Sequence, residues 1–419
     1  MIDRLLYNVI IHLYGASITV ASLFSPKARS WRAGRKEQWR NAARAVKDLD
    51  RPIWIHCASL GEFEQGRSII ESIKNIDATI PILLTFFSPS GYSIRKNYPC
   101  ADQVLYIPLD TVTNAHKFID LINPRMAIFV KYDFWFNILL ALHNRNIPFL
   151  YISVTLKKNH FLLHSWASNL LNIVAGARHI FVQDLSTANL LQTADISQVS
   201  VVGDTRVDRV VMLQNEAKSF PLLIAEQRSR QRIVFGSVWP SDIPVISSFL
   251  QSVDFEKFLV VVAPHDISRR SLDTWSKALN GHMVLFSQLS DVVSADTVLV
   301  DTMGDLAYLY TDAVLAYVGG GFDQGIHSIL EPAAALVPLL FGPKHTKFKE
   351  AFDLIRVGVA QIVTDADSFQ RAARYYLEEA DVETIRRLLM QYLEKNLGAT
   401  EKIMDYLVEE KLLYVPDFK

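Results

Sequence analysis

Two carboxylates in the first half of the chain stand where they could do chemistry. Glu62 lies in SLGEF, at the end of the apolar run PIWIHCAS, and Asp133 lies in KYDFW, directly after MAIFV. The apolar runs predict buried strands, and ligands of parallel sheets bind beyond the carboxyl ends of the strands. A carboxylate there can take a proton from a hydroxyl group as a general base. The structural alternative for Glu62 is an acidic residue favoured in the first turn of a helix.

Other turns that follow predicted strands of this half also carry polar or small residues. We expect Gly61 to let the chain turn tightly and so to keep its neighbour Glu62 exposed. The remaining positions are Ser59, Ser88, Ser90, Lys131 and Arg206. Solvated surface charge is the commoner fate of an arginine such as Arg206.

A glycine-rich turn marks the second half. In VGGGFDQGIHSILEP, Gly319, Gly320 and Gly321 follow an apolar run, and Glu331 opens the next predicted helix. Glycines let backbone amides approach a phosphate, and a helix N-terminus favours negative charge. The carboxylate of Glu331 can accept hydrogen bonds from a ribose diol, so the pattern favours a nucleotide-sugar donor. Its structural alternative is again an acidic residue in the first turn of a helix.

Three features have a structural explanation and are not predicted to be functional sites. Asp365 and Asp367 have the D-x-D spacing of metal-dependent glycosyltransferases, but they are expected to form a turn and a helix cap. His56 lies within an apolar strand, where a hydrogen-bonded core histidine is a simpler interpretation than a metal ligand. Cys57 and Cys100 fit no metal or C-x-x-C spacing and imply no disulfide framework.

The N-terminus predicts a membrane anchor. Residues 5–24, LLYNVIIHLYGASITVASLF, are about long enough to cross a hydrocarbon core, and a basic flank with Trp31 and Trp39 follows. Basic residues beside an apolar segment mark its cytoplasmic side, and tryptophans suit the headgroup layer. The alternative is an amphipathic or core helix.

The rest of the chain predicts an α/β protein. Beyond residue 50, seven β-branched or aromatic runs alternate with helical patterns in each half, which indicates parallel sheets covered on both faces. The expected organisation is an anchor with its basic flank at 1–40, a first Rossmann-like domain at 41–207, a linker at 208–231 and a second Rossmann-like domain at 232–419. The two domains are expected to face each other across a cleft. The net charge of -1 gives no reason to expect a nucleic-acid partner.

The motifs together resemble a known family. SLGEF, TFFSPSG, VDTMGDLAYLY, the glycine loop with its following LEPAAA, and PLLFGP are similar to the 3-deoxy-D-manno-octulosonic acid (Kdo) transferases of lipopolysaccharide assembly. The resemblance covers nearly the whole chain. It implies the two-domain GT-B glycosyltransferase fold, CMP-Kdo as donor, a lipid A precursor such as lipid IVA as acceptor, inversion at the anomeric centre and no metal or other cofactor.

The resemblance also implies roles for individual residues. Glu62 matches the catalytic glutamate of the family, and Asp133 stands where relatives carry an acidic residue followed by a tryptophan, so both are predicted to be catalytic. The predicted donor-binding residues are Gly236, Ser237, His265, Met303, Gly304, Gly319, Gly320, Gly321 and Glu331. The predicted acceptor or carboxylate contacts are Ser59, Gly61, Ser88, Ser90, Lys131 and Arg206.

This sequence departs from the family pattern in two places. Lys131 replaces an acidic position of some relatives, so Asp133 either orients a sugar, helps to hold Glu62 or pairs with Lys131. The arginine of a P-R-H segment is missing from APHD, so only the histidine, His265, carries over.

The expected location is the cytoplasmic face of an inner membrane, with the N-terminal anchor holding the protein there. Two other interpretations stay open at this point. One is another GT-B nucleotide-sugar glycosyltransferase or a sugar epimerase, and the other is a non-catalytic binding protein, which Glu62 argues against.

Overall fold

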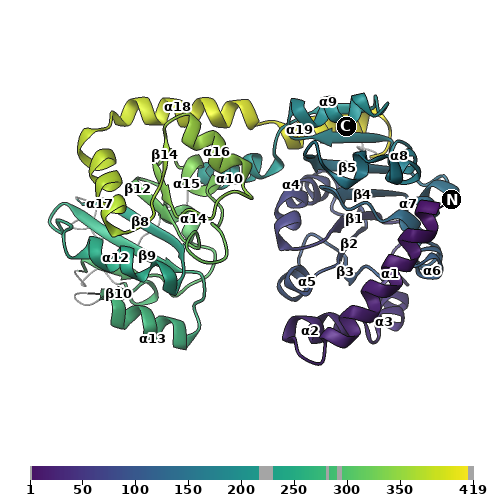
Figure 1. Cartoon of the computed structure of the whole chain (residues 1–419), viewed down its shortest axis with the longest axis horizontal. Helices are drawn as coiled ribbons and strands as arrows, with labels where there is room; N and C mark the ends of the chain where they lie inside the picture. Colours follow the sequence, from purple (N-terminus) through teal and green to yellow (C-terminus); the bar gives the residue numbers. More distant parts are fainter. Residues whose placement is uncertain (1, 217–229, 280–282, 290–294, 414–419) are drawn as a thin grey trace. The chain divides into compact units, whose positions relative to one another are not determined.

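The computed structural model describes residues 2–216, 230–279, 283–289 and 295–413 (Figure 1). The chain divides into two compact units, one formed by Met1–Asp208 with Leu397–Lys419 and the other by Arg209–Asn396. Each unit contains one seven-stranded sheet, and every strand pairing in both sheets is parallel. Residues 217–229 of the predicted linker lie outside the described residues.

The sheet of the first unit has the strand order β3-β2-β1-β4-β5-β6-β7. The strands are β1 (Ile53–Cys57), β2 (Ile82–Phe86), β3 (Gln103–Tyr106), β4 (Met126–Val130), β5 (Phe149–Val154), β6 (His179–Val182) and β7 (Val199–Val201). All seven apolar runs predicted in this half form strands. The order reverses between β1 and β4, which is where a doubly wound sheet opens a crevice for ligands.

The sheet of the second unit has the order β10-β11-β9-β8-β12-β13-β14. The strands are β8 (Gln231–Val238), β9 (Phe258–Pro264), β10 (Met283–Leu285), β11 (Thr297–Leu299), β12 (Ala313–Val318), β13 (Leu339–Phe341) and β14 (Ala360–Ile362). Again each predicted run forms a strand. The two sheets confirm the predicted fold of two Rossmann-like units.

Helices connect the strands. The first unit contains α1 (Ile2–Ala21), α2 (Pro26–Arg35), α3 (Gln38–Ala45), α4 (Leu60–Ile76), α5 (Pro89–Arg95), α6 (Val112–Ile122), α7 (Phe136–Asn144), α8 (Ser168–Val174), α9 (Leu185–Thr193) and α19 (Ala399–Glu409). Helix α10 (Thr205–Asn215) crosses the boundary between the units. The second unit contains α12 (Ile243–Leu250), α13 (Arg269–Ala278), α14 (Leu306–Leu309), α15 (Leu330–Ala334), α16 (Lys349–Arg356), α17 (Ala366–Arg374) and α18 (Val382–Asn396).

The apolar strands are buried because helices cover both faces of each sheet. In β1, Trp54 belongs to one hydrophobic cluster of the first unit, whereas Ile53 and Ile55 belong to another. Successive side chains of a strand point to opposite faces, so the two clusters are the cores on the two sides of one sheet. Both sides are dry, which explains why the strand sequence is apolar throughout rather than alternating.

The C-terminal helix corrects the predicted domain 232–419. The chain from Leu397 onward belongs to the first unit, and in Figure 1 the yellow α19 lies among elements of that unit. Ile403 and Leu407 are buried in the same cluster as the β1 residue Ile55. The carboxylate of Asp208 accepts hydrogen bonds from the backbone amides that open α19. The sequence pattern shows that α19 is amphipathic but does not say which sheet its apolar face covers.

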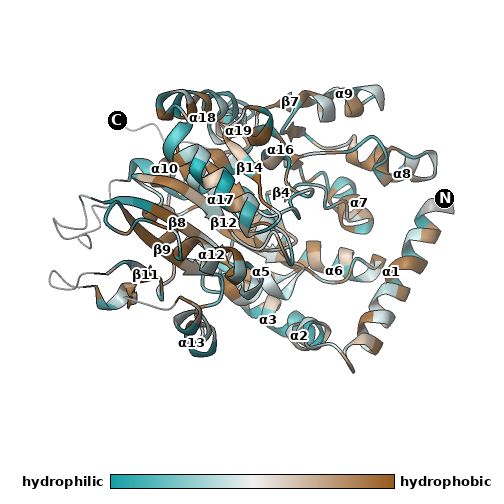
Figure 2. Cartoon of the chain, turned by 60° about the vertical axis from the view of Figure 1, so that its left-hand side comes forward, coloured by the Kyte–Doolittle hydropathy of each residue, from teal (hydrophilic) through white to brown (hydrophobic). Residues whose placement is uncertain are grey.

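The N-terminal segment forms two helices with a sharp bend between them. Helix α1 ends at Ala21, and the chain turns before α2, with an angle of 118° between the two helices. Within the described residues no single helix is long and apolar enough to cross a membrane, although the bent pair of α1 and α2 passes a test of length and composition. Figure 2 shows hydrophobic residues recurring along α1.

One side of α1 is held on the first unit by polar contacts. Tyr7 donates a hydrogen bond to Asp110 Oδ2 at 2.6 Å, and the side-chain amide of Asn137 donates to Asn8 Oδ1 at 2.8 Å. Burial raises the pKa of Asp110 to about 6, although Tyr7 and two backbone amides of α7 act in the opposite direction. The other side of α1 leaves apolar residues exposed, namely Leu5, Leu6, Val9, Ile10, Leu13 and Val20.

The placement of α19 predicts the effect of shortening Leu407. Leu407→Ala should lower the free energy of unfolding of the first unit by about 2 to 5 kcal/mol, because it leaves a cavity in the core of that unit. Hydrogen exchange of the β1 and β4 amides during urea unfolding measures this. Val408→Ala, on the exposed side of the same helix, is the control and should change stability little. If the substitution reduced hydrogen-exchange protection only in the sheet of the second unit, the assignment of α19 to the first unit would be contradicted.

Candidate functional site

Glu62 lies in the first turn of α4, directly beyond the carboxyl end of β1. Ser59 occupies the N-cap position, but its hydroxyl donates to Glu62 Oε2 rather than accepting from a backbone amide of the helix. On the other side, Lys131 Nζ lies 3.6 Å from Glu62 Oε1. The carboxylate is therefore oriented by two neighbours, and 16% of the side chain remains exposed.

Lys131 comes from the end of β4, the strand that pairs with β1. Its φ is +66°, in the left-handed region that few non-glycine residues adopt. Such conformations persist where the surrounding structure holds them, and they cluster at functional sites. Among the described residues Lys131 pairs with Glu62, so the structure does not favour the predicted alternative in which Asp133 pairs with Lys131.

Gly61 needs a different explanation from the one the sequence suggested. It lies within the first turn of α4, outside the left-handed region, so the chain does not need a glycine to turn here. A Cβ at this position would meet only Ser59 Oγ, at an ordinary contact distance of 3.8 Å. The missing side chain instead leaves open space beside Glu62, where a substrate group can approach.

Asp133 lies beside a buried histidine. Its Oδ2 lies 3.2 Å from His56 Nε2, and the indole of Trp135 lies within hydrogen-bonding distance, also 3.2 Å, of the same nitrogen. One nitrogen cannot accept from the indole and donate to the carboxylate at the same time, so the proton on Nε2 decides which contact is made. The structure confirms His56 as a core histidine, and it shows in addition that this histidine lies beside Asp133.

The other ring nitrogen of His56 contacts a threonine of the neighbouring strand β2. His56 Nδ1 lies 2.8 Å from Thr85 Oγ1, which also accepts from the Trp54 indole at 2.8 Å. Because the indole can only donate, the hydroxyl proton of Thr85 is free to point to Nδ1. In that arrangement the imidazole proton lies on Nε2 and faces Asp133, whereas a proton on Nδ1 leaves Nε2 to accept from Trp135. Sequence reasoning missed this network, because its members come from different strands.

Glu62 and Asp133 both lie close enough to Tyr132 to act on its hydroxyl group electrostatically. The pKa of Tyr132 is raised by burial, then by Glu62 and Asp133. Burial likewise raises the pKa of Cys57, and both carboxylates add to that effect. The two predicted catalytic carboxylates therefore belong to one site in the first unit.

The remaining predicted contacts of this unit are built differently. Ser88 caps α5, accepting from the Ser90 amide at 3.3 Å, and the two hydroxyls lie 2.9 Å apart. The Arg206 guanidinium donates to both carboxylate oxygens of Asp204. Burial on its own would raise the pKa of Asp204, but Arg206, with a smaller effect from Lys131, lowers it overall.

The predicted donor residues of the second unit gather at one edge of its sheet. Gly236 and Ser237 lie at the end of β8, His265 follows β9, and the three glycines Gly319–Gly321 follow β12. These strands are neighbours in the order β9-β8-β12. The His265 amide donates to Val238 O at 2.9 Å, so the ends of β8 and β9 are joined.

A buried carboxylate that sequence reasoning missed holds this edge together. Asp242 Oδ2 accepts from the amides of Trp239 and Gly320, at 2.7 and 3.1 Å, and Oδ1 accepts from the Tyr317 hydroxyl at 2.7 Å. Burial raises the pKa of Asp242, and these hydrogen bonds oppose that effect. The carboxylate ties the glycine loop to the end of β8.

The glycines themselves are explained by close packing of the chain. A Cβ at Gly319 would lie 2.5 Å from Val238 Cα, and one at Gly321 would lie 2.6 Å from the Gly342 backbone. At Gly236 it would meet the Tyr310 hydroxyl. The requirement for glycine therefore comes from chain packing, and phosphate binding by this loop stays a prediction.

Three flat rings form a stack beside the loop. Trp239 lies 4.8 Å from His265, and His265 lies 4.4 Å from His327, between ring centroids. The Trp239 indole donates to His327 Nε2 at 2.7 Å. Burial lowers the pKa of His327 to about 4, with His265 as a second cause, and burial also lowers the pKa of His265. Both imidazoles are neutral at pH 7.

The last three predicted donor residues have looser surroundings. Met303 is 77% exposed, and Gly304 adopts a φ of +95° with no atom within 4 Å of its Cβ position. Glu331 lies in the first turn of α15 and contributes, after burial, to raising the pKa of Tyr310. Met303 follows β11, the neighbour of β9, so it belongs to the same edge of the sheet.

The D-x-D segment is a helix cap, as predicted. Asp365 caps α17 and forms a capping box with Ser368. In the part of the chain that the structure describes, no cluster of histidine, cysteine or acidic residues is arranged to hold a metal ion. Cys57 and Cys100 are both free thiols.

Comparisons with known proteins identify relatives of this chain. Residues 29–209 match the family described as 3-deoxy-D-manno-octulosonic-acid transferase (kdotransferase). The 3-deoxy-D-manno-octulosonic acid transferase of Haemophilus influenzae is 24% identical over 405 residues, covering 92% of this chain and 93% of the relative. The transferase of the same name from Bordetella pertussis is also 24% identical, covering 92% and 91%.

Solved structures share the fold. A putative UDP-N-acetylglucosamine 2-epimerase from Listeria monocytogenes superposes with a TM-score of 0.57 at 14% identity, covering 87% of this chain and 98% of the other. MurG of Acinetobacter baumannii gives 0.54 at 11% identity, covering 85% and 100%. With its two Rossmann-like units, the chain is a glycosyltransferase of the GT-B fold. It is a relative of the Kdo transferases, which confirms the resemblance drawn from its motifs.

The ring stack predicts a pH dependence of stability. The folded state disfavours the protonated form of His327, so the unfolded chain binds more protons between its ordinary pKa of about 6.5 and the folded value of about 4. The second unit should therefore be fully stabilised above pH 6.5 and lose stability as the pH falls towards 4. Urea unfolding across this range measures it, and His327→Gln should flatten the curve. An NMR titration midpoint of His327 near 6.5 would contradict the account.

Proposed function

We propose that the enzyme transfers Kdo from CMP-Kdo to a lipid A precursor, lipid IVA, in lipopolysaccharide biosynthesis. The observation that carries the proposal is Glu62, set at the switch point of the first sheet between Ser59 and Lys131, in a relative of the Kdo transferases. A carboxylate oriented in this way, beside the open space at Gly61, suits a base for a hydroxyl nucleophile.

The proposed step is a direct displacement. The acceptor hydroxyl oxygen forms a bond to the anomeric carbon of Kdo, and the bond from that carbon to the phosphate oxygen of CMP breaks with its electron pair. The hydroxyl proton passes to Glu62. Attack on the face opposite the leaving phosphate inverts the anomeric centre, and a single carboxylate base is sufficient for this reaction.

Asp133 has a second role in the proposal. When His56 carries its proton on Nε2, that proton faces the carboxylate of Asp133, and Asp133, like Glu62, lies near Tyr132. A carboxylate there can accept a hydrogen bond from another hydroxyl of the acceptor and so orient the attacking one. Trp135 packs against His56 and limits the movement of the pair.

The second unit is proposed to bind CMP-Kdo along the edge formed by β11, β9, β8 and β12. The amides near Ser237 and the glycine loop suit the phosphate, and the exposed Met303 suits a contact with the base. Glu331 is the candidate partner of the ribose diol. The neutral stack that includes His265 offers hydrogen bonds without adding charge.

The membrane is proposed to bind α1. The exposed apolar residues of α1, followed by Leu23 and Phe24 and the cations of α2, fit a helix that lies in the plane of the cytoplasmic surface of an inner membrane. Of the two predicted alternatives for this segment, a spanning anchor and an amphipathic helix, the proposal takes the amphipathic helix. Trp31 and Trp39, which were expected in the headgroup layer, are instead partly buried against the protein.

The test of the donor and acceptor is release of CMP from CMP-Kdo with and without detergent-dispersed lipid IVA. Release that requires the lipid is expected, and a chelator should leave its rate unchanged, because the proposed reaction uses no metal. The assignment would be refuted if CMP were released at the same rate without the lipid. It would also be refuted if the enzyme released no CMP from CMP-Kdo but turned over another nucleotide sugar.

Glu62→Gln should lower kcat by roughly a hundred- to ten-thousand-fold, because glutamine cannot take the proton of the acceptor hydroxyl. The measurement is lipid-dependent CMP release at saturating substrates. Glu64→Gln is the matched control, since Glu64 lies on the same helix but pairs with Arg95 and Arg67. Equal rates for wild type and Glu62→Gln would eliminate Glu62 as the base.

Leu13→Asp combined with Val20→Asp should weaken binding to anionic vesicles by at least about tenfold, because two exposed apolar side chains of α1 are lost to charge. Vesicle sedimentation measures it. The control carries the same change of charge on exposed residues of α18, Val382→Asp with Met390→Asp. Equal loss in the control would point to net charge rather than to α1.

A further inference from the structure

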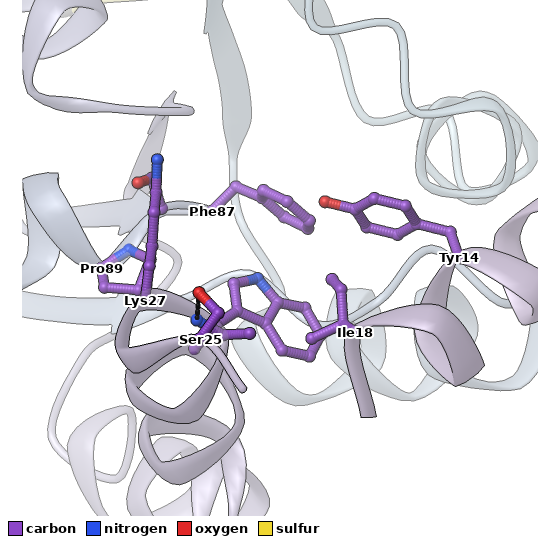
Figure 3. A pocket seen from close by; sticks show the side chains of 9 residues that line it. Tyr14, Ile18, Ser25, Lys27, Phe87 and Pro89 are labelled. Carbon is purple, nitrogen blue, oxygen red and sulfur yellow. Dashed lines mark hydrogen bonds between the residues drawn. The ribbon is translucent and has the colours of Figure 1, made fainter. Parts of the chain in front are cut away.

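A cavity of about 350 Å³ lies between the N-terminal helices and the loop that follows β2 (Figure 3). Tyr14 and Ile18 of α1, Ala28 and Trp31 of α2, and Phe87 form most of its apolar lining. The volume falls in the range of pockets that hold small ligands, roughly 300 to 1,000 Å³. The whole cavity belongs to the first unit.

The walls of this pocket, which we call the α1–α2 pocket, are fixed by contacts within the chain. Tyr14 stacks on Phe87 with 6.1 Å between ring centroids, and Trp31 meets Phe87 edge-on at 5.7 Å. Figure 3 shows Tyr14 and Phe87 next to each other, with the Tyr14 hydroxyl directed toward Phe87. Arg35 lies 3.8 Å from the Trp31 ring centroid and donates to Phe87 O at 2.8 Å. The pocket is therefore preformed.

Its charge is positive. Lys27 contributes to the lining, and within the described part of the chain it has no ion-pair partner. Arg29 and Arg32 are exposed on the same helix. Arg35, behind Trp31, is surrounded by aromatic rings and backbone carbonyls, and burial lowers its pKa to about 9. An apolar pocket with cations at its rim is complementary to the hydrocarbon chain of an anionic lipid.

The same loop connects the pocket to the catalytic site. On its other side Phe87 contacts Trp135, with 4.9 Å between ring centroids, and Trp135 reaches His56 beside Asp133. The amides of Phe87 and Ser88 both donate to Ala58 O, directly before Ser59. One molecule that places a hydroxyl at Glu62 can therefore extend an apolar chain past Phe87.

From these observations we infer that the α1–α2 pocket binds one acyl chain of the acceptor lipid, with Lys27 pairing with an anionic group of the same molecule. The inference rests on the proposed lipid acceptor and adds how the enzyme recognises it. Tyr14 and Ile18 come from the helix whose exposed face carries Leu13 and Val20, so a chain leaving the bilayer at α1 meets the pocket directly.

The kinetic test uses substitutions that fill the α1–α2 pocket with a larger side chain. Ala28→Phe should raise the ratio of KM for acylated lipid IVA to KM for fully deacylated acceptor at least tenfold, and Ile18→Phe, from the opposite wall, should do the same. Ala33→Phe is the matched control, because Ala33 is exposed on the same helix and does not line the pocket. An unchanged ratio in both folded variants would overturn the inference.

A binding test separates this inference from the proposed function. Brominated dodecyl phosphate, below its micelle concentration, should quench tryptophan fluorescence saturably, and Trp31→Phe or Ala28→Phe should remove most of the effect. Lipid IVA should displace the probe. No turnover of lipid IVA by wild type would refute the proposed function, whereas saturable quenching would still support chain binding. The inference would be overturned if the probe did not quench tryptophan fluorescence in active protein. It would also be overturned if phosphatidylglycerol displaced the probe and lipid IVA did not.

Discussion

Parallel pairing of the strands is the constraint on which the rest of the structure depends. Because every strand of a sheet runs in the same direction, all of its carboxyl ends meet at one edge, and residues far apart in sequence become neighbours there. In the first unit β1 delivers Glu62, and its neighbour β4 delivers Lys131 and Asp133. In the second unit β8, β9 and β12 bring together the ring stack and the glycine loop. The chemistry of each unit is thus a consequence of its strand order.

The strands and their loops could be predicted because the signal is local. A strand buried on both faces is apolar throughout, so the runs that became β1 and β9 are visible in the sequence itself. The polar residues that follow them, such as Glu62 and His265, are visible for the same reason. Motif resemblance then supplied roles that composition and spacing alone leave open, and the relatives of the chain support the family.

Contacts between distant segments could not be predicted in the same way. The capping of α19 by Asp208 joins residues that are almost half the chain apart, and nothing near either one shows it. The same holds for Asp242, which looks like an ordinary helix-start acid but is buried and holds the loop of Gly320. Amphipathic helices show that they have an apolar face, but the sequence does not identify the surface that covers it.

Burial determines the role of several polar residues. His56 is fully buried and works through its neighbours, Thr85 on one side and Asp133 on the other. Burial keeps His327 neutral, because it lowers the pKa of the imidazole. A neutral imidazole can contact a negatively charged donor molecule through a hydrogen bond but not through an ion pair. Arg35 stabilises the aromatic wall beneath α2 rather than a membrane surface. Residue type alone would have assigned each of them differently.

The central claim is that the carboxylate of Glu62 serves a lipid acceptor of Kdo. Mass spectrometry of detergent-dispersed lipid IVA, after incubation with the purified enzyme and freshly generated CMP-Kdo, tests this claim most directly. The account predicts a product whose mass has increased by one or more Kdo residues, and the mass counts them. Lipid IVA of unchanged mass, with CMP released or with the donor intact, would contradict it.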